Sequence, residues 1–138
     1  MPRLSLFLNA ARVLPMLGVM GAIFYLSHQP GDVFNFPEIW SLDKILHAVA
    51  YGFLAATVIW AFPPGVRQQS ADRIAVGVLC LCLTYGISDE LHQSFIPGRF
   101  PSSLDVVADF AGSMIVVLVW RYVAVKRKTR IISDENLI

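Results

Sequence analysis

The chain has 138 residues, of which 56% are hydrophobic and only 15% are charged, and its mean hydropathy is +0.60. An average soluble domain has about a quarter of its residues charged, so this composition excludes an ordinary soluble domain and is typical of a membrane protein. The balance of 11 basic against 10 acidic residues gives no reason to expect a nucleic-acid partner. The length is that of one domain, and we expect residues 1–138 to form a single transmembrane unit.

Four apolar blocks follow one another, each flanked by charges or by Pro and Gly. They are continuous apolar runs without the alternation of a transmembrane barrel, so we expect an all-α, polytopic membrane protein. The first block follows arginines, as a signal peptide would, but it leads into "SHQPGD" and not into a small-residue cleavage site, so we expect it to be retained. The four predicted transmembrane helices cover about residues 10–28, 43–62, 73–96 and 103–125.

The third and fourth predicted helices extend into charged sequence. A membrane-spanning helix needs about 20 residues, yet the apolar run that begins at Ile74 has only 14 residues before Ser88, Asp89 and Glu90. This helix must therefore continue through "DELHQSFI" to Ile96, where Pro-Gly stops it. The fourth helix must likewise begin near Ser103. Ionisable side chains then lie at membrane depth, where they are costly and usually face a cavity or one another.

Lysine and arginine are distributed unequally between the two predicted sides of the membrane. With four crossings, both termini and the loop after the second helix share one side, which carries nine of the eleven basic residues, while Lys44 and Arg99 lie on the other. Cytoplasmic loops are enriched in Lys and Arg, so we expect both termini in the cytoplasm and residues 126–138 to form a basic cytoplasmic tail. Seven of the ten acidic residues fall on the extracytoplasmic side.

Polar side chains repeat at helical spacing at the extracytoplasmic ends of the second, third and fourth predicted helices. Residues three or four apart share one face of a helix, so each helix presents a polar stripe, and we expect the stripes to converge. Arg99, in the turn between the third and fourth helices, is expected to pair with several carboxylates or with a bound anion. The polar residues are Asp43, His47 and Tyr51, then Asp89, Glu90, His92 and Gln93, then Asp105 and Asp109.

The segments "SHQPG", "LDKILHAVAYGFLA" and "YGISDELHQSFIPGRFPSSLDVVADFAGS" resemble the VanZ-like family of small bacterial membrane proteins. The resemblance implies an integral protein of the bacterial cytoplasmic membrane. The founding member raises resistance to teicoplanin, a glycopeptide that carries a lipid tail. The resemblance therefore implies membrane lipids as partners, together with a lipid-tailed glycopeptide or an envelope precursor, but it does not supply a reaction. The family signature stands here at Asp43, Lys44, His47, Tyr51, Asp89, Glu90, His92, Gln93, Pro97, Gly98, Arg99, Asp105, Asp109 and Gly112.

Two functional classes are open for the polar site. In the first, the site binds the head of an envelope lipid or of a lipid-tailed glycopeptide, and the protein contributes to envelope function or antibiotic resistance. In the second, the protein is a hydrolase or transferase acting on an outer-leaflet lipid through acid–base groups or a zinc or magnesium ion, although no HExxH or GxSxG motif is present. The ligand-binding candidates are Asp43, His47, Tyr51, Glu90, Gln93 and Arg99, and the catalytic candidates are Asp89, His92, Asp105 and Asp109.

Two further interpretations compete with these. An ion or proton path would need polar residues along the cytoplasmic halves of the helices, but "AATVIWAF" and "IVVLVW" are nearly apolar. A structural role would pair Asp43 with Lys44 or Arg99, and His47 with Asp109, so that the pairs hold short helices together without adding net stability. The cofactor and the oligomeric state stay open.

Overall fold

The computed structural model describes residues 10–31 and 42–135, with side chains as far as residue 127. Within these ranges it contains five helices and no strand, which agrees with the predicted all-α class. The predictions for residues 1–9, 32–41 and 136–138 lie outside the described residues. The helices are α2 (Leu14–Ser27), α3 (Leu42–Ala61), α4 (Pro64–Gln69), α5 (Ala71–Gln93) and α6 (Ser103–Glu135).

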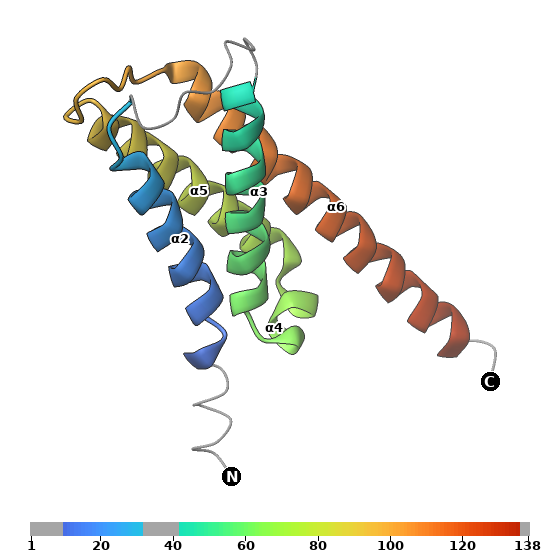
Figure 1. Cartoon of the computed structure of the whole chain (residues 1–138). Helices are drawn as coiled ribbons and strands as arrows, with labels where there is room; N and C mark the ends of the chain where they lie inside the picture. Colours follow the sequence, from blue (N-terminus) through green and yellow to red (C-terminus); the bar gives the residue numbers. More distant parts are fainter. Residues whose placement is uncertain (1–9, 32–41, 136–138) are drawn as a thin grey trace.

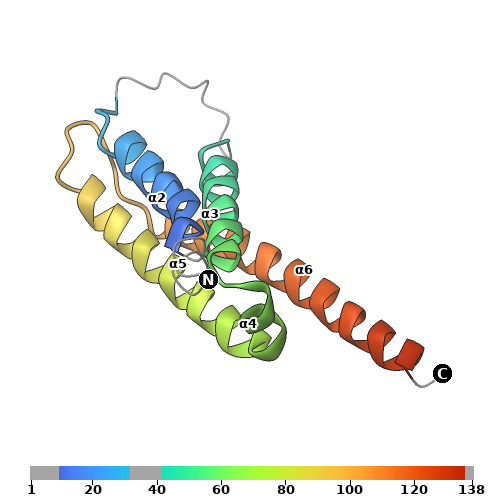
Figure 2. The ribbon, with the colours of Figure 1, turned by 90° about the horizontal axis from the view of Figure 1, so that it is seen from below.

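The helices α2, α3 and α5 lie side by side, and α6 packs against α3 and α5 along its first half, as far as Arg121, and then extends away from them (Figures 1 and 2). At one end of this bundle α2 and α5 end, and α3 and α6 begin. We call this the polar end. At the opposite end α2 begins, the short helix α4 joins α3 to α5, and α6 ends (Figure 1).

The helix boundaries agree with the prediction at some ends and differ at others. Helix α3 matches the predicted 43–62 to within one residue at each end, and α6 begins at the predicted Ser103. Helix α5 ends at Gln93 and not at residue 96, because the residue before Pro97 is disfavoured in helical conformation. Helix α6 continues ten residues past the predicted end at Val125, since the sequence contains no Pro or Gly there.

The beginning of the first described helix and the connection between α3 and α5 also differ from the prediction. The predicted helix 10–28 is observed as α2 from Leu14, preceded by helical residues 10–11 and a turn at residues 12–13. Helix α4 was not predicted; it begins with Pro64, whose fixed φ suits the first helical position.

Three helices of the described chain are long and apolar enough to cross a membrane: residues 42–61, 71–93 and 103–127. Helix α2 is apolar but has only 14 residues, a length of about 21 Å against roughly 30 Å of hydrocarbon. The membrane character of the chain is therefore supported, while the fourth crossing stays a prediction.

The core lies where α3, α5 and α6 meet. Its fully buried members include Leu54 of α3, Val78 and Cys82 of α5, and Val117 of α6. Many large apolar side chains outside this core are exposed, among them Phe53 at 66%. An apolar outer surface of this kind is what contact with lipid requires, because only lipid-facing helices can leave such side chains outside the core without a hydrophobic penalty.

Candidate functional site

Polar side chains are buried at the polar end of the bundle, where the three predicted polar stripes meet the end of α2 (Figure 1). Asp109 is only 1% exposed, and Asp89 and Glu90 are 5% and 7% exposed. Buried charges are tolerated only where they are paired or hydrogen-bonded, so the contacts of these residues define the site. We call the following residues the polar cluster: Ser27, Lys44, His47, Asp89, Glu90, Gln93, Asp105 and Asp109.

Ion pairs between α3 and α6 form one half of the polar cluster. Lys44 Nζ lies 2.7 Å from Asp43 Oδ2 and 2.5 Å from Asp105 Oδ1; the second contact is an ion pair without hydrogen-bond geometry. One turn further along α3, His47 Nδ1 lies 3.0 Å from Asp109 Oδ1, and its Nε2 lies 4.0 Å from Asp105 Oδ2. The Asp43–Lys44 and His47–Asp109 pairings expected from the sequence are both present.

Hydrogen bonds between α5, α2 and the beginning of α6 form the other half. Ser27 Oγ donates to Asp89 Oδ2 over 2.8 Å, and Gln93 Nε2 donates to the same oxygen over 3.0 Å. Glu90 Oε2 accepts a 2.7 Å hydrogen bond from the backbone N–H of Ser102, just before α6. The acids of α5 therefore hold the end of α2 and the beginning of α6 in place.

Glu90 also joins the two halves in a possible metal site. His47, Glu90 and Asp105 come from three helices, and each offers one ligand atom such that all three atoms lie within 4.8 Å of one another. Ligands of one zinc or magnesium ion lie at most about 4.2 Å apart, so small side-chain movements would bring these atoms to one cation. The contact of His47 Nδ1 with Asp109 leaves Nε2 available, an arrangement common behind metal-bound histidines.

Besides Asp105 Oδ1, which is ion-paired with Lys44, two buried oxygen atoms at the polar cluster have no hydrogen-bond partner among the described residues. They are Tyr51 OH and Asp109 Oδ2, and both side chains are 1% exposed. Asp109 Oδ2 and the ring of Tyr51 face Gly86 of α5: a Cβ at Gly86 would lie 2.9 Å from Asp109 Oδ2 and 3.4 Å from Tyr51 Cε1. An unpaired buried polar group costs about 1–3 kcal/mol, so this part of the site has unused hydrogen-bonding capacity.

His92 lies against α2, as Asp89 does, and not beside Asp105 and Asp109, with which it was expected to converge. Its Nε2 is 3.2 Å from His28 Nδ1, and its ring stacks on Phe24 at a centroid distance of 4.9 Å. The four predicted catalytic candidates are therefore divided: Asp105 and Asp109 lie beside His47, Asp89 is bonded to Ser27 and Gln93, and His92 stacks on α2.

Arg99 also binds α2. Its Nη2 donates to the carbonyl of Leu26 and its Nε to that of Gln29, over 2.9 and 3.0 Å, so the guanidinium satisfies carbonyls at the end of the helix. The turn is further attached by Gly31 N–H, which donates to Pro97 O over 3.2 Å. These contacts hold Arg99 against the end of α2, and its predicted role as an anion ligand stays a prediction.

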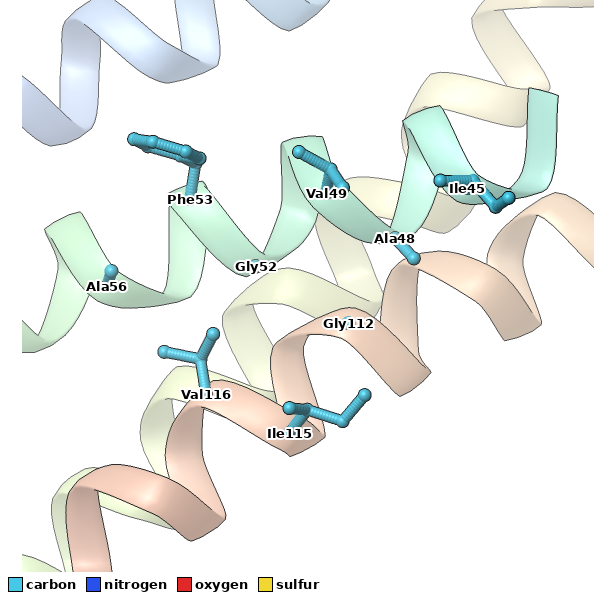
Figure 3. A pocket seen from close by; sticks show the side chains of 9 residues that line it. All are labelled: Ile45, Ala48, Val49, Gly52, Phe53, Ala56, Gly112, Ile115 and Val116. Atoms are coloured by element: carbon cyan, nitrogen blue, oxygen red, sulfur yellow. The ribbon is translucent and has the colours of Figure 1, made fainter. Parts of the chain in front are cut away.

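An apolar groove of about 450 Å³ lies between α3 and α6 (Figure 3). The helices approach closely at Gly112, where an added Cβ would overlap the carbonyl of Ala48, and at Gly52, where it would lie 3.4 Å from Val116 Cγ2. Lys44 lies one turn before Ala48 on the same face of α3, so the groove begins beside the polar cluster. The groove is lined by Ile45, Ala48, Val49, Gly52, Phe53, Ala56, Gly112, Ile115 and Val116.

Comparison with models of known protein families matches residues 8–125 to the family described as VanZ/LLP1. The chain belongs to the VanZ/LLP1 family. The match covers α2 to α5 and nearly all of residues 103–127, the part of α6 that is apolar enough to cross a membrane, and it confirms the resemblance noted in the sequence. Comparisons with curated proteins and with solved structures return no match.

Some site residues of this VanZ/LLP1 protein were not among the candidates. Ser27 and Ser102 could not be predicted as site residues, because neither belongs to one of the predicted polar stripes. Lys44 was recognised as part of the family signature but not as the cation that pairs with Asp105. The available signal was the spacing of Lys44, Ala48 and Gly52, because residues four apart lie on one helix face. The two small residues let α6 approach this face, so Lys44 on the same face lies close to α6 and its acids.

Proposed function

We propose that this VanZ/LLP1 protein crosses the bacterial cytoplasmic membrane four times, with both termini in the cytoplasm and the polar end outside. The excess of Lys and Arg in the terminal segments and in the loop between α3 and α5 supports this orientation. The course of the helices is consistent with it, since α2 begins and α6 ends at the same end of the bundle (Figure 1).

We propose that the function of this protein is to bind a lipid-tailed molecule, with the head at the polar cluster and the tail in the groove between α3 and α6. The main support for this proposal is that the groove begins one helical turn from the Lys44–Asp105 ion pair. An apolar tail that leaves the bilayer for this groove keeps an apolar environment, while the head gains hydrogen-bonding partners that lipid cannot supply.

The composition of the polar cluster indicates the kind of head group. The cluster contains four carboxylates against Lys44 and His47, so it offers mainly hydrogen-bond acceptors. A head rich in hydroxyl, amide or amine donors suits it better than a bare anion. Sugar and peptide head groups have this chemistry, as do envelope precursors and lipid-tailed glycopeptides of the teicoplanin type. A contribution to envelope function or glycopeptide resistance would follow from binding them.

Native mass spectrometry of protein purified in mild detergent tests this proposal. Ala56→Leu places a larger side chain in the groove and should lower the fraction of protein that retains lipid by about tenfold or more. Gly77→Leu is the matched control, because Gly77 faces open space on α5. The same variants should differ in binding added teicoplanin. Equal retention of lipid by Ala56→Leu, Gly77→Leu and wild type would refute binding in this groove.

A second candidate function is favoured by the proximity of His47, Glu90 and Asp105. These residues would hold a divalent cation, which would polarise a phosphate or carbonyl group of an outer-leaflet lipid and so support a hydrolase or transferase. Asp109 would orient His47 in that case, as its contact with Nδ1 does already.

Metal analysis distinguishes the two candidates. After dialysis against zinc or magnesium, the enzyme hypothesis expects about one equivalent of retained metal, which Asp105→Asn and His47→Ala should abolish. Asp72→Asn is the control, since Asp72 is an exposed acid in the first turn of α5, at the end of that helix away from the polar cluster. Wild-type protein that retains no metal, or an Asp105→Asn variant that retains as much as wild type, would exclude this site and leave binding alone.

A further inference from the structure

Two arginines share one tryptophan ring at the opposite end of the bundle. The guanidinium carbon of Arg12, from the turn before α2, lies 5.2 Å from the ring centroid of Trp60, in the last turn of α3. The guanidinium carbon of Arg67, from α4, lies 5.5 Å from the same centroid. Three separate elements of the chain therefore bring two positive charges together on one aromatic side chain.

The charge of this pair is not balanced within the described part of the chain. Neither Arg12 nor Arg67 has a carboxylate partner there, and Asp72, an acid at this end, is bonded to Arg121. Arg12 Nη1 is also shielded from solvent without a hydrogen-bond acceptor. Stacking on Trp60 compensates only part of this cost, because a cation–π contact supplies no acceptor for a buried N–H group.

The electrostatics of Arg67 agree with this geometry. Burial and the neighbouring Arg12 guanidinium both lower the pKa of Arg67, which means that its charged form is disfavoured where it stands. An anion between the two arginines would oppose this shift, since its charge would offset the repulsion and its oxygens would accept hydrogen bonds from both guanidinium groups in place of water.

We propose that Arg12 and Arg67 bind a phosphate group, and that its source is the head of an anionic phospholipid. Guanidinium groups match phosphate oxygens in pairs, so phosphate is the anion that this arrangement suits. Trp60 is 51% exposed and adjoins the apolar surface of α3, and a tryptophan in this setting sits at the level of the lipid head groups. The site is separate from the polar cluster and does not depend on the function proposed for it.

Thermal unfolding of the full chain in a neutral detergent, titrated with short-chain phosphatidylglycerol, tests this site. Phosphatidylglycerol should raise the melting temperature, and phosphatidylcholine at the same concentration should raise it much less. Arg67→Gln should weaken the effect of phosphatidylglycerol at least tenfold in apparent affinity, and the double variant with Arg12→Gln should abolish it. Arg121→Gln is the control, because it removes a charge at the same end of the bundle from an exposed ion pair.

Inorganic phosphate identifies the source of the ligand. Stabilisation by phosphatidylglycerol but not by inorganic phosphate supports a lipid site, whereas equal stabilisation by both would overturn the lipid assignment. If Arg12→Gln impairs folding, Arg67→Lys keeps the charge but loses the paired geometry, and it should give an intermediate affinity. A response to phosphatidylglycerol that is the same in wild type, Arg67→Gln and Arg121→Gln would overturn the site itself.

Discussion

Replacing Gly112 by alanine should separate α3 from α6 and disturb the site. The added Cβ would overlap the carbonyl oxygen of Ala48 and would lie only 2.6 and 2.7 Å from its carbonyl carbon and Cα. All three atoms belong to the backbone, so no side-chain rotation can relieve the overlap. Because carbon atoms in contact are about 3.5–4.0 Å apart, the helices must move apart by roughly 1 Å.

This movement has an energetic and a functional consequence. Overpacking of a close contact costs about 1–3 kcal/mol, which corresponds to a fall of roughly 4–12 °C in melting temperature for a chain of this size. A shift of roughly 1 Å would also stretch the 3.0 Å contact between His47 and Asp109 beyond hydrogen-bonding distance. Binding at the polar cluster should therefore weaken along with stability.

The assay is thermal unfolding of the detergent-solubilised protein, together with the lipid-retention measurement. Gly77→Ala is the matched control, because no atom lies within 4 Å of a Cβ at that position and alanine favours a helix. We expect Gly77→Ala to melt at or slightly above the wild-type temperature. If Gly112→Ala melts together with Gly77→Ala, the close approach of α3 and α6 is not what positions the site.

Three further substitutions test individual contacts by the same melting measurement. Ser27→Ala removes a hydrogen bond from the buried carboxylate of Asp89 and should cost about 1–3 kcal/mol; an unchanged melting temperature would show that α2 is not held there. Tyr85→Phe removes a 2.7 Å hydrogen bond to a backbone carbonyl of α2, for a loss of about 1 kcal/mol that a neutral result would contradict. Asp72→Asn breaks an exposed ion pair with Arg121 and should cost less than about 1 kcal/mol, so a large loss would be unexpected.

The sequence predicted contacts that follow helical periodicity. The spacing of Asp43, His47 and Tyr51 placed them on one face of a helix, and the i, i+4 repeat of Asp105 and Asp109 did the same for the helix that packs against it. The His47–Asp109 pairing followed from these two faces and the opposite charges of a protonated histidine and a carboxylate.

Other contacts could not be predicted because their chemistry has no periodic pattern. Arg99 donates to two backbone carbonyls of the α2 end, and the sequence could not predict these bonds because every residue possesses such an acceptor. His92 has the spacing of a cluster residue relative to Asp89, yet stacking on Phe24 decides its position. Ser27 is joined to the cluster only by the packing of α2 on α5, which no local sequence feature encodes.

The attachment of the α5–α6 turn to α2 has an evolutionary consequence. The bonds from Arg99 to Leu26 and Gln29 end on backbone carbonyl oxygens, which any residue at these positions would offer. Gly31 and Gly98, in contrast, cannot be replaced by another residue without strain. A Cβ on Gly31 would overlap the carbonyl of Gly98, and Gly98 has a φ of 75°, which favours glycine. Substitutions at position 26 should therefore preserve the bond from Arg99, whereas substitutions at either glycine should break the contact between the turn and α2. At position 29 the carbonyl acceptor would also be kept, but the hydrogen bond from the Gln29 side chain to the carbonyl of Tyr25 would be lost.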